Sequence, residues 1–415
     1  MVCVGCFSGS MHARAADSSG DGPDAAAYGQ ALGYPVALRG QANTQRFMVG
    51  SYSHFDAIYP SRTIAKPPVP SPLRASRMPA SFAYVSHNQL YTLDSYLSRN
   101  PATGLLIARG NTVLFERYQY GRTAADRMTS QSMAKTVVAM LVGIAIEEHA
   151  IRSVDDPADA YVPELGGTEL GRTPIRALLH MASGIAFTET YDGHDDIALL
   201  SRLLFAPSGP GPVSSVARFS NRTAPPDTVW HYAGLNTELL GLVLVRATGQ
   251  SLASYLQSRI WQPMGAEADA SWTTDGTGQE IAYCCFNAVL RDYARFGLLL
   301  ASGGAVGGRQ IIPSQWLADA TTASAPNAAL APGSNSQAWG YGYQTWLMPG
   351  PQREIAMMGV HGQRVFIDPP SGLVLVQTAV RVSATRSEGD IELNALWRGL
   401  LEHGGPNRTQ PHRVQ

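Results

Sequence analysis

The chain has 415 residues, 31 basic and 32 acidic side chains, and a formal net charge of −1. This balance excludes the strongly basic surface that nucleic-acid binding requires, so no nucleic-acid partner is expected. An apolar content of 45% excludes a disordered chain, and a charged fraction of 15% is too low for a coiled coil. The length allows two or three domain-sized units, or one large domain with an insertion.

Residues 1–75 are predicted to form a flexible N-terminus followed by an arm that packs on the body. Residues 1–45 are rich in Gly, Ala and Ser and are expected to be loosely ordered, whereas aromatic and apolar residues return over residues 47–64. Residues 13–15 resemble a small-residue cleavage site, but the apolar piece before them is short and has no basic start. The expected compartment is therefore cytoplasmic, or periplasmic if these residues are the remnant of a signal peptide.

A β-hairpin is predicted at the start of the body. Apolar runs at 105–109 and 112–117 flank Gly110-Asn111, a two-residue turn typical of hairpins. The longest uninterrupted apolar run, residues 137–146, is about half of what a membrane span needs. It therefore predicts a buried helix over about 132–148 and no membrane span.

Helices are expected to fill the middle of the chain. Thr173-Pro174 has the pattern of a helix start, and Asn287 is predicted to cap another helix. Further segments with apolar residues at helical spacing are 196–205, 236–246, 251–261 and 290–298.

Strands return in the last third, at 341–347, 365–368 and 373–378, before a final amphipathic helix around Trp397. Strands at both ends and helices between them predict an α+β fold, in which helices flank an antiparallel sheet and an all-helical insertion interrupts it. The body is expected to span 76–403, with an α/β part at 76–150 and 275–403. The insertion would cover 151–274, and residues 404–415 would form a disordered tail.

The four cysteines do not predict a disulfide framework. Cys3 and Cys6 have the spacing of metal ligands, but no second Cys/His pair follows to complete a tetrahedral site. No metal is therefore expected. The adjacent Cys284 and Cys285 are expected to pack as small apolar residues rather than to serve a redox role.

Lysine is scarce in this chain: Lys66 and Lys135 are the two lysines among the 31 basic residues. Arginine stays protonated in proteins, whereas a desolvated lysine can lose its proton. Lys66 precedes a proline pair and is interpreted as incidental. Lys135 lies at the start of the predicted buried helix, three residues after Ser132.

Ser132 and Lys135 should share one face of that helix because of their spacing. The positive end of the helix dipole and the apolar neighbours both lower the pKa of the lysine. A neutral amine so placed can accept the proton of the serine hydroxyl and make it a nucleophile. The alternative is that Ser132 only starts the helix and Lys135 reaches solvent.

Other hydrolase and cofactor motifs are absent from the sequence. No Gly-x-Ser-x-Gly motif occurs, which argues against an α/β-hydrolase triad. No His-Glu-x-x-His, phosphate loop or dinucleotide fingerprint occurs either, so no cofactor is expected.

Five motifs in order resemble the serine β-lactamase and penicillin-recognising superfamily over roughly residues 100–400. Within it, the chain is most similar to the 6-aminohexanoate-dimer hydrolases and the β-lactamase-like (family VIII) carboxylesterases. The motifs are Ser132–Lys135, Tyr161–Leu165, Trp230–Asn236, Leu290–Gly297 and Val360–Gln363. The resemblance implies a β-lactamase/transpeptidase-like fold and an acyl-enzyme formed on Ser132.

The resemblance also gives Tyr232 a place opposite the serine and lysine. A phenol there could take the serine proton as phenolate and return it to the leaving group as phenol. Without the resemblance, Tyr232 would be interpreted as a half-buried aromatic residue. Asn236 belongs to the active site or, equally, caps the next helix.

Two more tyrosines match positions in the aminohexanoate enzymes. Tyr191 matches a tyrosine that assists the amide leaving group, and Tyr283 replaces an asparagine that holds the amino end of the substrate. This replacement argues against a strict aminohexanoate preference. Asp192, Asp195 and Asp196 would either meet a cationic group of the substrate or form a solvated helix start.

His361-Gly362-Gln363 stands where the superfamily normally carries Lys-Thr-Gly. The resemblance implies an oxyanion hole made by the backbone N–H groups of Ser132 and Val360. His361 could equally be a strand residue with its hydrogen bonds satisfied. The missing lysine weakens the case for a penicillinase, because that cation normally faces the substrate carboxylate.

These inferences predict a metal-independent serine hydrolase that acts on a small-molecule ester or linear amide, such as an aminohexanoate oligomer. A β-lactamase or a D-aminoacyl peptidase is the enzymatic alternative. A β-lactam or peptidoglycan sensor without turnover is the alternative from another class. The chain is expected to be a monomer or a homodimer.

Overall fold

The computed structural model describes residues 20–323, 330–331, 339–350, 352–385 and 387–404. The predicted hairpin is present as strands β5 (Ala102–Arg109) and β6 (Thr112–Tyr118), which pair antiparallel. Gly110 adopts a φ of 55° in the turn, a conformation that glycine takes without steric cost.

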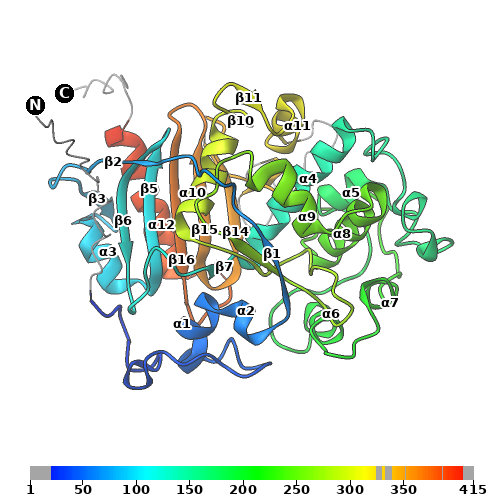
Figure 1. Cartoon of the computed structure of the whole chain (residues 1–415), viewed down its shortest axis with the longest axis horizontal. Helices are drawn as coiled ribbons and strands as arrows, with labels where there is room; N and C mark the ends of the chain where they lie inside the picture. The colour runs from blue at the N-terminus through cyan, green and yellow to red at the C-terminus, as the bar shows by residue number, and fades with distance from the viewer. Residues whose placement is uncertain (1–19, 324–329, 332–338, 351, 386, 405–415) are drawn as a thin grey trace, which may run out of the picture.

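An eight-stranded sheet forms the centre of the molecule, in the order β12-β13-β14-β15-β16-β5-β6-β2. Its pairs are antiparallel except for β2 with β6. Strand β16, from the end of the chain, pairs with β5 from its beginning, as Figure 1 shows. The remaining strands are β2 (Arg74–Ala75), β12 (Gly340–Tyr341), β13 (Trp346–Leu347), β14 (Ile355–Gly359), β15 (Gln363–Asp368) and β16 (Leu373–Ala379).

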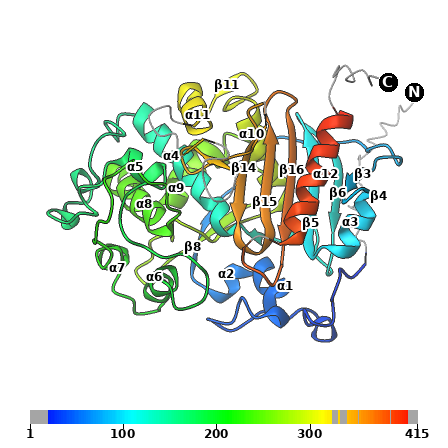
Figure 2. The ribbon, with the colours of Figure 1, turned by 180° about the vertical axis from the view of Figure 1, so that it is seen from behind.

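Both faces of this sheet are covered by helices. Along β5, Leu106 and Ala108 face one apolar core, whereas Leu105 and Ile107 face another, because side chains alternate along a strand. Helix α10 (Leu290–Ala301) packs on the first face. Helices α3 (Leu93–Arg99) and α12 (Glu388–Gly404) cover the second face, which Figure 2 presents to the viewer. This arrangement confirms the predicted α+β fold.

A second, four-stranded sheet has the order β1-β8-β9-β7. Its strands are β1 (Ser61–Ile64), β8 (Ala270–Thr273), β9 (Phe286–Ala288) and β7 (Met128–Thr129). Strand β7 leads into the 3-10 turn η2 (Gln131–Met133) and then helix α4 (Ala134–Glu147), as predicted for the buried helix. The sheet therefore fixes the segment that carries Ser132.

The chain between α4 and β8 contains helices joined by long turns and loops, and it lies to one side of the sheets (Figure 1). The predicted helices are present, and α8 packs on α4 and α5. The prediction of an all-helical insertion up to residue 274 is wrong at its end, because β8 pairs there with β1 and β9. The helices are α5 (Ile175–Leu179), α6 (Asp196–Leu204), α7 (Pro212–Val216), α8 (Gly234–Thr248), α9 (Leu252–Leu256) and a π-helical turn (Gln257–Trp261).

Two local predictions are corrected. The strand predicted at 341–347 is instead two short strands, β12 and β13, with a turn between them in which Gln344 has a φ of 51°. Asn287 does not cap α10, because it lies inside β9. Its amide donates to Ser271 and to the carbonyl of Cys285, so its hydrogen bonds serve the small sheet instead.

The prediction of a loosely ordered N-terminal segment is wrong for residues 20–45. Tyr28 and Tyr34 pack edge-on against Tyr120, and the Tyr28 hydroxyl donates to the carbonyl of Val380 at 2.6 Å. Aromatic burial compensates for a composition rich in small residues. Helices α1 (Gln45–Ser53) and α2 (Phe55–Ile58) continue this segment below the sheets in Figure 1.

The remaining elements complete the covering layers. They are η1 (Gln30–Leu32), β3 (Tyr84–Ser86), β4 (Gln89–Tyr91), η3 (Ala158–Ala160), η4 (Pro163–Leu165), β10 (Ala305–Val306), β11 (Arg309–Gln310), α11 (Ser314–Ala320) and η7 (Val360–Gly362). Within the described ranges, no single helix is long and apolar enough to cross a membrane; α8 and the α9 segment reach that length only together, across a 74° bend.

Candidate active site

Ser132 lies in a tightly constrained turn between β7 and α4. The preceding residue, Gln131, has a φ of 46°, which is uncommon for a residue with a side chain. The Ser130 N–H donates to the carbonyl of Phe286 at 2.7 Å and ties the turn to β9. Gly359 closes the other side, since a Cβ there would lie 2.5 Å from the Ser130 oxygen. The end of β14 can therefore approach the serine only because residue 359 is glycine.

The side chain of Lys135 is buried and lies within hydrogen-bonding distance of Ser132. Its Nζ is 2.9 Å from Ser132 Oγ and 3.1 Å from the carbonyl oxygen of Tyr283. The residue is 1% exposed, so the alternative in which the amine reaches solvent does not hold. The same nitrogen lies 5.0 Å from the ring centre of Tyr232 and 5.4 Å from that of Tyr283.

Burial lowers the pKa of Lys135 to about 8. Glu189 acts in the opposite direction, as does Glu238 when ionised, because a carboxylate favours the charged ammonium; burial raises the pKa of Glu238 itself to about 8. A pKa near 8 leaves about a tenth of the amine neutral at pH 7. Lys135 can therefore act as a base near neutral pH, which an ordinary surface lysine cannot.

Tyr232 is held beside the serine and the lysine by aromatic packing. Its ring stacks on Trp346 at 5.7 Å and meets Tyr341 edge-on. Burial, followed by the charge of Glu189, raises the pKa of Tyr232, whereas a hydrogen bond with Ser132 acts in the opposite direction. The hydroxyl is therefore a protonated phenol at neutral pH, and the phenolate form considered from the sequence is disfavoured.

Tyr191 is joined to a carboxylate that the sequence reasoning did not select. Its hydroxyl donates to Glu189 Oε1 at 2.6 Å, and the N–H of Gly234 donates to Glu189 Oε2 at 2.5 Å. Burial and the charge of Glu189 raise the pKa of Tyr191 well above its usual value, so this phenol also keeps its proton. Glu189 thus links the loop of Tyr191 to the start of α8.

The three aspartates beside Tyr191 organise their own loop. Asp195 caps α6 through the Ala198 N–H and also accepts the N–H of Tyr191 at 2.6 Å. Asp192 and Asp196 accept hydrogen bonds from neighbouring groups of the same loop. The arrangement agrees with the interpretation of a helix start rather than a site for a cationic group.

Two cavities meet at the serine. One is about 230 Å³ and the other about 660 Å³. Both are lined by Ser132, Glu189, Tyr191 and Val360. The smaller cavity has a largely aromatic wall, made by Trp230, Tyr232, Trp339, Trp346 and Phe366. The larger one is lined by, among others, Arg39, Asn43, Tyr59, Ser201, Tyr283, Cys284, Cys285 and His361.

The positions of Ser132 and Val360 suit an oxyanion hole. Each lies in the first turn of a short helix, η2 and η7, where backbone N–H groups have no carbonyl partner within the helix. Both residues line both cavities. The predicted oxyanion hole would use these two N–H groups.

The rest of the 360–363 motif is mainly structural. His361 lines the larger cavity, but its Nδ1 is 2.7 Å from the Arg381 carbonyl, and burial lowers the pKa of the ring. Gly362 has a φ of 95°. The Gln363 side-chain amide donates to the carbonyl of Ala379 and accepts from its N–H. Gly362 and Gln363 line neither of the two cavities.

Asn236 lines neither of the two cavities. It is fully buried in the first turn of α8, and its amide nitrogen lies 3.6 Å from the sulfur of Met181. The predicted capping role is wrong, because Ala233 occupies the N-cap position.

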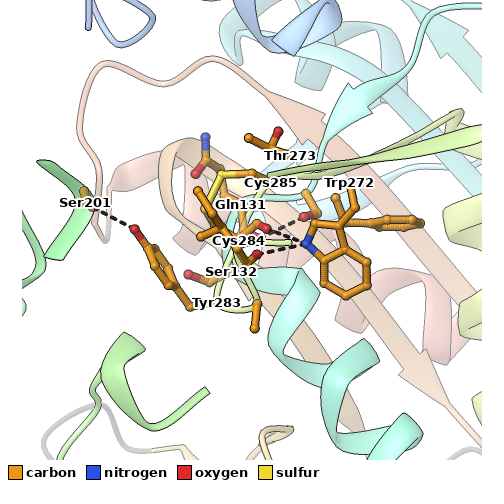
Figure 3. The surroundings of a disulfide bond; sticks show 12 residues. Gln131, Ser132, Ser201, Trp272, Thr273, Tyr283, Cys284 and Cys285 are labelled. Atoms are coloured by element: carbon orange, nitrogen blue, oxygen red, sulfur yellow. Dashed lines mark hydrogen bonds between the residues drawn. A yellow bond between two sulfur atoms is a disulfide. The ribbon is translucent and has the colours of Figure 1, made fainter. Parts of the chain in front are cut away.

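Tyr283 takes part through its backbone as well as its ring. Its carbonyl accepts from Lys135, and its hydroxyl is 2.8 Å from Ser201 Oγ in the larger cavity. The next two residues, Cys284 and Cys285, form a disulfide, so the expectation that they pack only as small apolar residues is wrong (Figure 3). A bond between adjacent cysteines has no spacing signal in a sequence, and only the fold reveals it.

Within the described part of the chain, no group of three or more His, Cys, Asp or Glu side chains is arranged to hold a metal ion. The sequence reasoning also missed Glu189, Trp339, Trp346 and Arg364, which line the cavities. Glu189 stands two residues before Tyr191 and could have been suggested by that proximity. The other three come from strands and turns whose contact with the serine depends on the tertiary fold.

Comparisons with known proteins agree with this architecture. The family model described as Beta-lactamase matches residues 95–395. The 6-aminohexanoate-dimer hydrolase of Paenarthrobacter ureafaciens is 26% identical over 299 residues, which are 70% of this chain and 75% of that protein. These matches confirm the resemblance inferred from the five motifs.

Two solved structures show the same fold. A Bacillus anthracis protein assigned by name as a 6-aminohexanoate-dimer hydrolase superposes with a TM-score of 0.80 and 24% identity, covering 88% of this chain and 97% of its own. EstCE1, a hydrolase with promiscuous acyltransferase activity, superposes with a TM-score of 0.59 and 16% identity. That match covers 72% of this chain and 93% of EstCE1.

Proposed function

The chain belongs to the Beta-lactamase family, and from the groups around Ser132 we propose that it is a serine hydrolase that cleaves carboxylic esters or linear amides through an acyl-enzyme. The observation that carries the proposal is the buried Lys135 amine, 2.9 Å from the Ser132 hydroxyl. A base of lowered pKa beside a hydroxyl at the junction of two cavities is what a serine nucleophile requires.

Acylation begins with attack of Ser132 Oγ on the substrate carbonyl. Lys135 accepts the serine proton as the bond forms, because its amine has a pKa of about 8. The N–H groups of Ser132 and Val360 stabilise the developing oxyanion. The Tyr283 carbonyl accepts one hydrogen of the amine and so directs its lone pair toward the serine.

Collapse of the tetrahedral intermediate breaks the bond to the leaving group. Tyr232, a phenol at neutral pH, donates its proton to the leaving oxygen or nitrogen, and the ammonium of Lys135 re-protonates the phenol. Water then attacks the ester on Ser132, with Lys135 accepting its proton. Release of the acid returns the hydrogen to Ser132 and leaves the site as it began.

The shape of the site supports a linear substrate. The aromatic walls of the smaller cavity suit an unbranched apolar chain, and the larger cavity can hold the group on the other side of the scissile bond. His361 stands where a penicillinase carries a lysine, which disfavours a carboxylated lactam. The name of the Paenarthrobacter ureafaciens relative supports a linear amide, whereas Tyr283 in the larger cavity favours a broader range that includes short esters.

A small substrate panel tests the proposal. We expect turnover of 4-nitrophenyl butyrate or of the aminohexanoate dimer, and none by a Ser132→Ala variant. Nitrocefin hydrolysis without ester or linear-amide hydrolysis would instead indicate a β-lactamase, and D-alanyl amide hydrolysis alone a D-aminoacyl peptidase. One equivalent of product followed by no further release would indicate a sensor that stays acylated.

A further inference from the structure

A disulfide between two adjacent residues, Cys284 and Cys285, forms part of the wall of the larger cavity. Figure 3 shows it beside Gln131 and Ser132, with Trp272 on one side and Tyr283 on the other. The mechanism proposed above does not use these sulfur atoms. Their position in the turn that supplies the Tyr283 carbonyl nevertheless connects them to the catalytic base.

The back of this turn is fixed to the small sheet. The Trp272 indole N–H lies 2.9 Å from the carbonyl of Ile281 and 3.0 Å from that of Cys284, and donates to both. The Thr273 N–H donates to the Cys285 carbonyl at 3.1 Å. The two cysteines are therefore anchored on one side by β8.

The front of the turn faces Lys135. The Tyr283 carbonyl accepts from Lys135 Nζ at 3.1 Å, and the Glu238 carboxylate accepts the Ala282 N–H at 2.8 Å. The Tyr283 carbonyl belongs to the peptide bond whose nitrogen is that of Cys284. Any rotation at Cys284 consequently moves the oxygen that orients the lysine.

The disulfide restricts this rotation. Joining neighbouring sulfur atoms closes an eight-membered ring that contains the Cys284–Cys285 peptide, so the backbone torsions inside the ring can no longer vary independently. Cys285 also has a φ of 68°, a left-handed conformation that is unfavourable for a residue with a side chain. Opening the ring would remove the covalent constraint on this conformation.

We propose that the Cys284–Cys285 disulfide is a positioning element for Lys135, so that the reactivity of Ser132 depends on the redox state of this pair. The inference rests on the proposed function and adds a form of control to it. Both cysteines are buried but line the larger cavity, which is the route by which a small dithiol would reach the sulfur atoms. A thiolate of the dithiol attacks one sulfur, breaks the protein disulfide and forms a mixed disulfide. The second thiol of the reagent then attacks the mixed disulfide, which leaves two protein thiols and a cyclic disulfide of the reagent.

Reduction should affect both the orientation and the protonation of the lysine. Four groups face its amine besides Ser132, namely Glu189, Tyr232, Glu238 and Tyr283. Burial is the largest cause of the lowered pKa, so a looser turn that admits water raises that pKa toward its usual value. Reduced protein should therefore react more slowly, with its pH midpoint shifted toward alkaline pH.

The experiment measures the rate at which a fluorophosphonate labels Ser132 and the kcat/KM for 4-nitrophenyl butyrate, each as a function of pH. Both quantities are compared before and after treatment with dithiothreitol, and free thiols are titrated in each state. The Cys3→Ser/Cys6→Ser background ensures that any thiols gained belong to Cys284 and Cys285. We expect a decrease on the order of tenfold at pH 7, since a displacement of about 1 Å can cost roughly 100-fold. We also expect an alkaline shift of the midpoint.

The matched control adds Cys284→Ser/Cys285→Ser to the same background. It should resemble the reduced protein and be insensitive to dithiothreitol. The inference would be overturned if reduction added two thiols without changing the labelling rate, kcat/KM or the midpoint of the pH profile. It would also be overturned if both thiols were free before reduction, or if dithiothreitol could not reduce the pair. Failure of the oxidised protein to label at Ser132 would instead overturn the proposed function itself, and the inference with it.

Discussion

Lys135 Nζ lies between two oxygen atoms, 2.9 Å from the hydroxyl of Ser132 and 3.1 Å from the carbonyl of Tyr283. The carbonyl can only accept a hydrogen, whereas the hydroxyl can also donate one. For a neutral amine, this difference points an N–H toward Tyr283 and the lone pair toward Ser132. In the proposed mechanism, the direction of proton transfer is thus set by a backbone group 148 residues away in the sequence.

The pH dependence of catalysis follows from the lowered pKa of Lys135. Activity needs the neutral amine, so kcat/KM for 4-nitrophenyl butyrate should increase about tenfold per pH unit below pH 8 and level off above it. Because the pKa of Lys135 is lowered to about 8, its amine becomes protonated and activity is lost as the pH falls through about 8. A profile that is flat between about pH 6 and 9, or a midpoint near the usual lysine pKa of about 10.4, would contradict the assignment.

Replacing Lys135 by arginine should retain the positive charge and abolish turnover. A guanidinium does not release its proton in a protein, so it cannot accept the hydrogen of Ser132. We expect kcat to fall by about 10³-fold. Steady-state ester hydrolysis measures the loss, and a thermal unfolding curve checks that the fold is retained.

The second lysine of the chain provides the matched control. Lys66 is exposed, and its backbone N–H and carbonyl form hydrogen bonds with the side chains of Asp269 and Gln262. Lys66→Arg should therefore leave kcat unchanged. Equal activity of the two variants would show that Lys135 is not the base.

Glu189→Gln should shift the pH profile toward acid. The carboxylate is the larger of the two charges that raise the pKa of Lys135, so its neutralisation lets burial lower that pKa further. The midpoint of kcat/KM should move below pH 8, and more activity should remain at pH 7 relative to the plateau. Asp192→Asn, on the same loop but exposed, serves as the control and should not move the midpoint. An unchanged or alkaline midpoint in Glu189→Gln would remove Glu189 from the electrostatics of the site.

The proximity of the proposed nucleophile and base could be predicted from the sequence because their relation is local. Ser132 and Lys135 are three residues apart on a helix, and the apolar run after them already implied burial. Tyr232 was identified only through the motif resemblance, since nothing in its neighbourhood fixes its distance from the serine. The α+β fold could be predicted because each helix and strand has its own local periodicity, and the order of these elements gives the fold class.

The remaining parts of the site depend on long-range contacts. Glu189 acquires a role through the Tyr191 hydroxyl and the Gly234 N–H, of which the second lies 45 residues away. Asn236 was misassigned because the sequence pattern of a helix start is the same whether or not a side chain in its first turn faces a cavity. The residues of β8 were expected to be helical because one of their two partner strands, β1, comes from a distant part of the chain. Pairing of this kind leaves no periodic signal in the short strand itself.

Tyr191→Phe should reduce amide hydrolysis more than ester hydrolysis. The Tyr191 phenol keeps its proton because burial and Glu189 raise its pKa, and it lines both cavities beside Ser132. An amine leaving group must be protonated as it departs, so a hydrogen bond from Tyr191 would assist the proton transfer from Tyr232, whereas 4-nitrophenolate leaves readily as an anion. We expect kcat for the aminohexanoate dimer to fall about 100-fold and that for 4-nitrophenyl butyrate by less than about threefold.

A distant tyrosine controls for the loss of a hydroxyl alone. Tyr161 donates to Asp156 in the helical region and lines neither cavity, so Tyr161→Phe should leave the ratio of amide to ester rates unchanged. Loss of both activities to the same extent in Tyr191→Phe would mean that this hydroxyl supports Glu189 rather than the leaving group. In that case the pH midpoint should shift as it does in Glu189→Gln, because the Glu189 carboxylate would no longer be held in place by its 2.6 Å hydrogen bond.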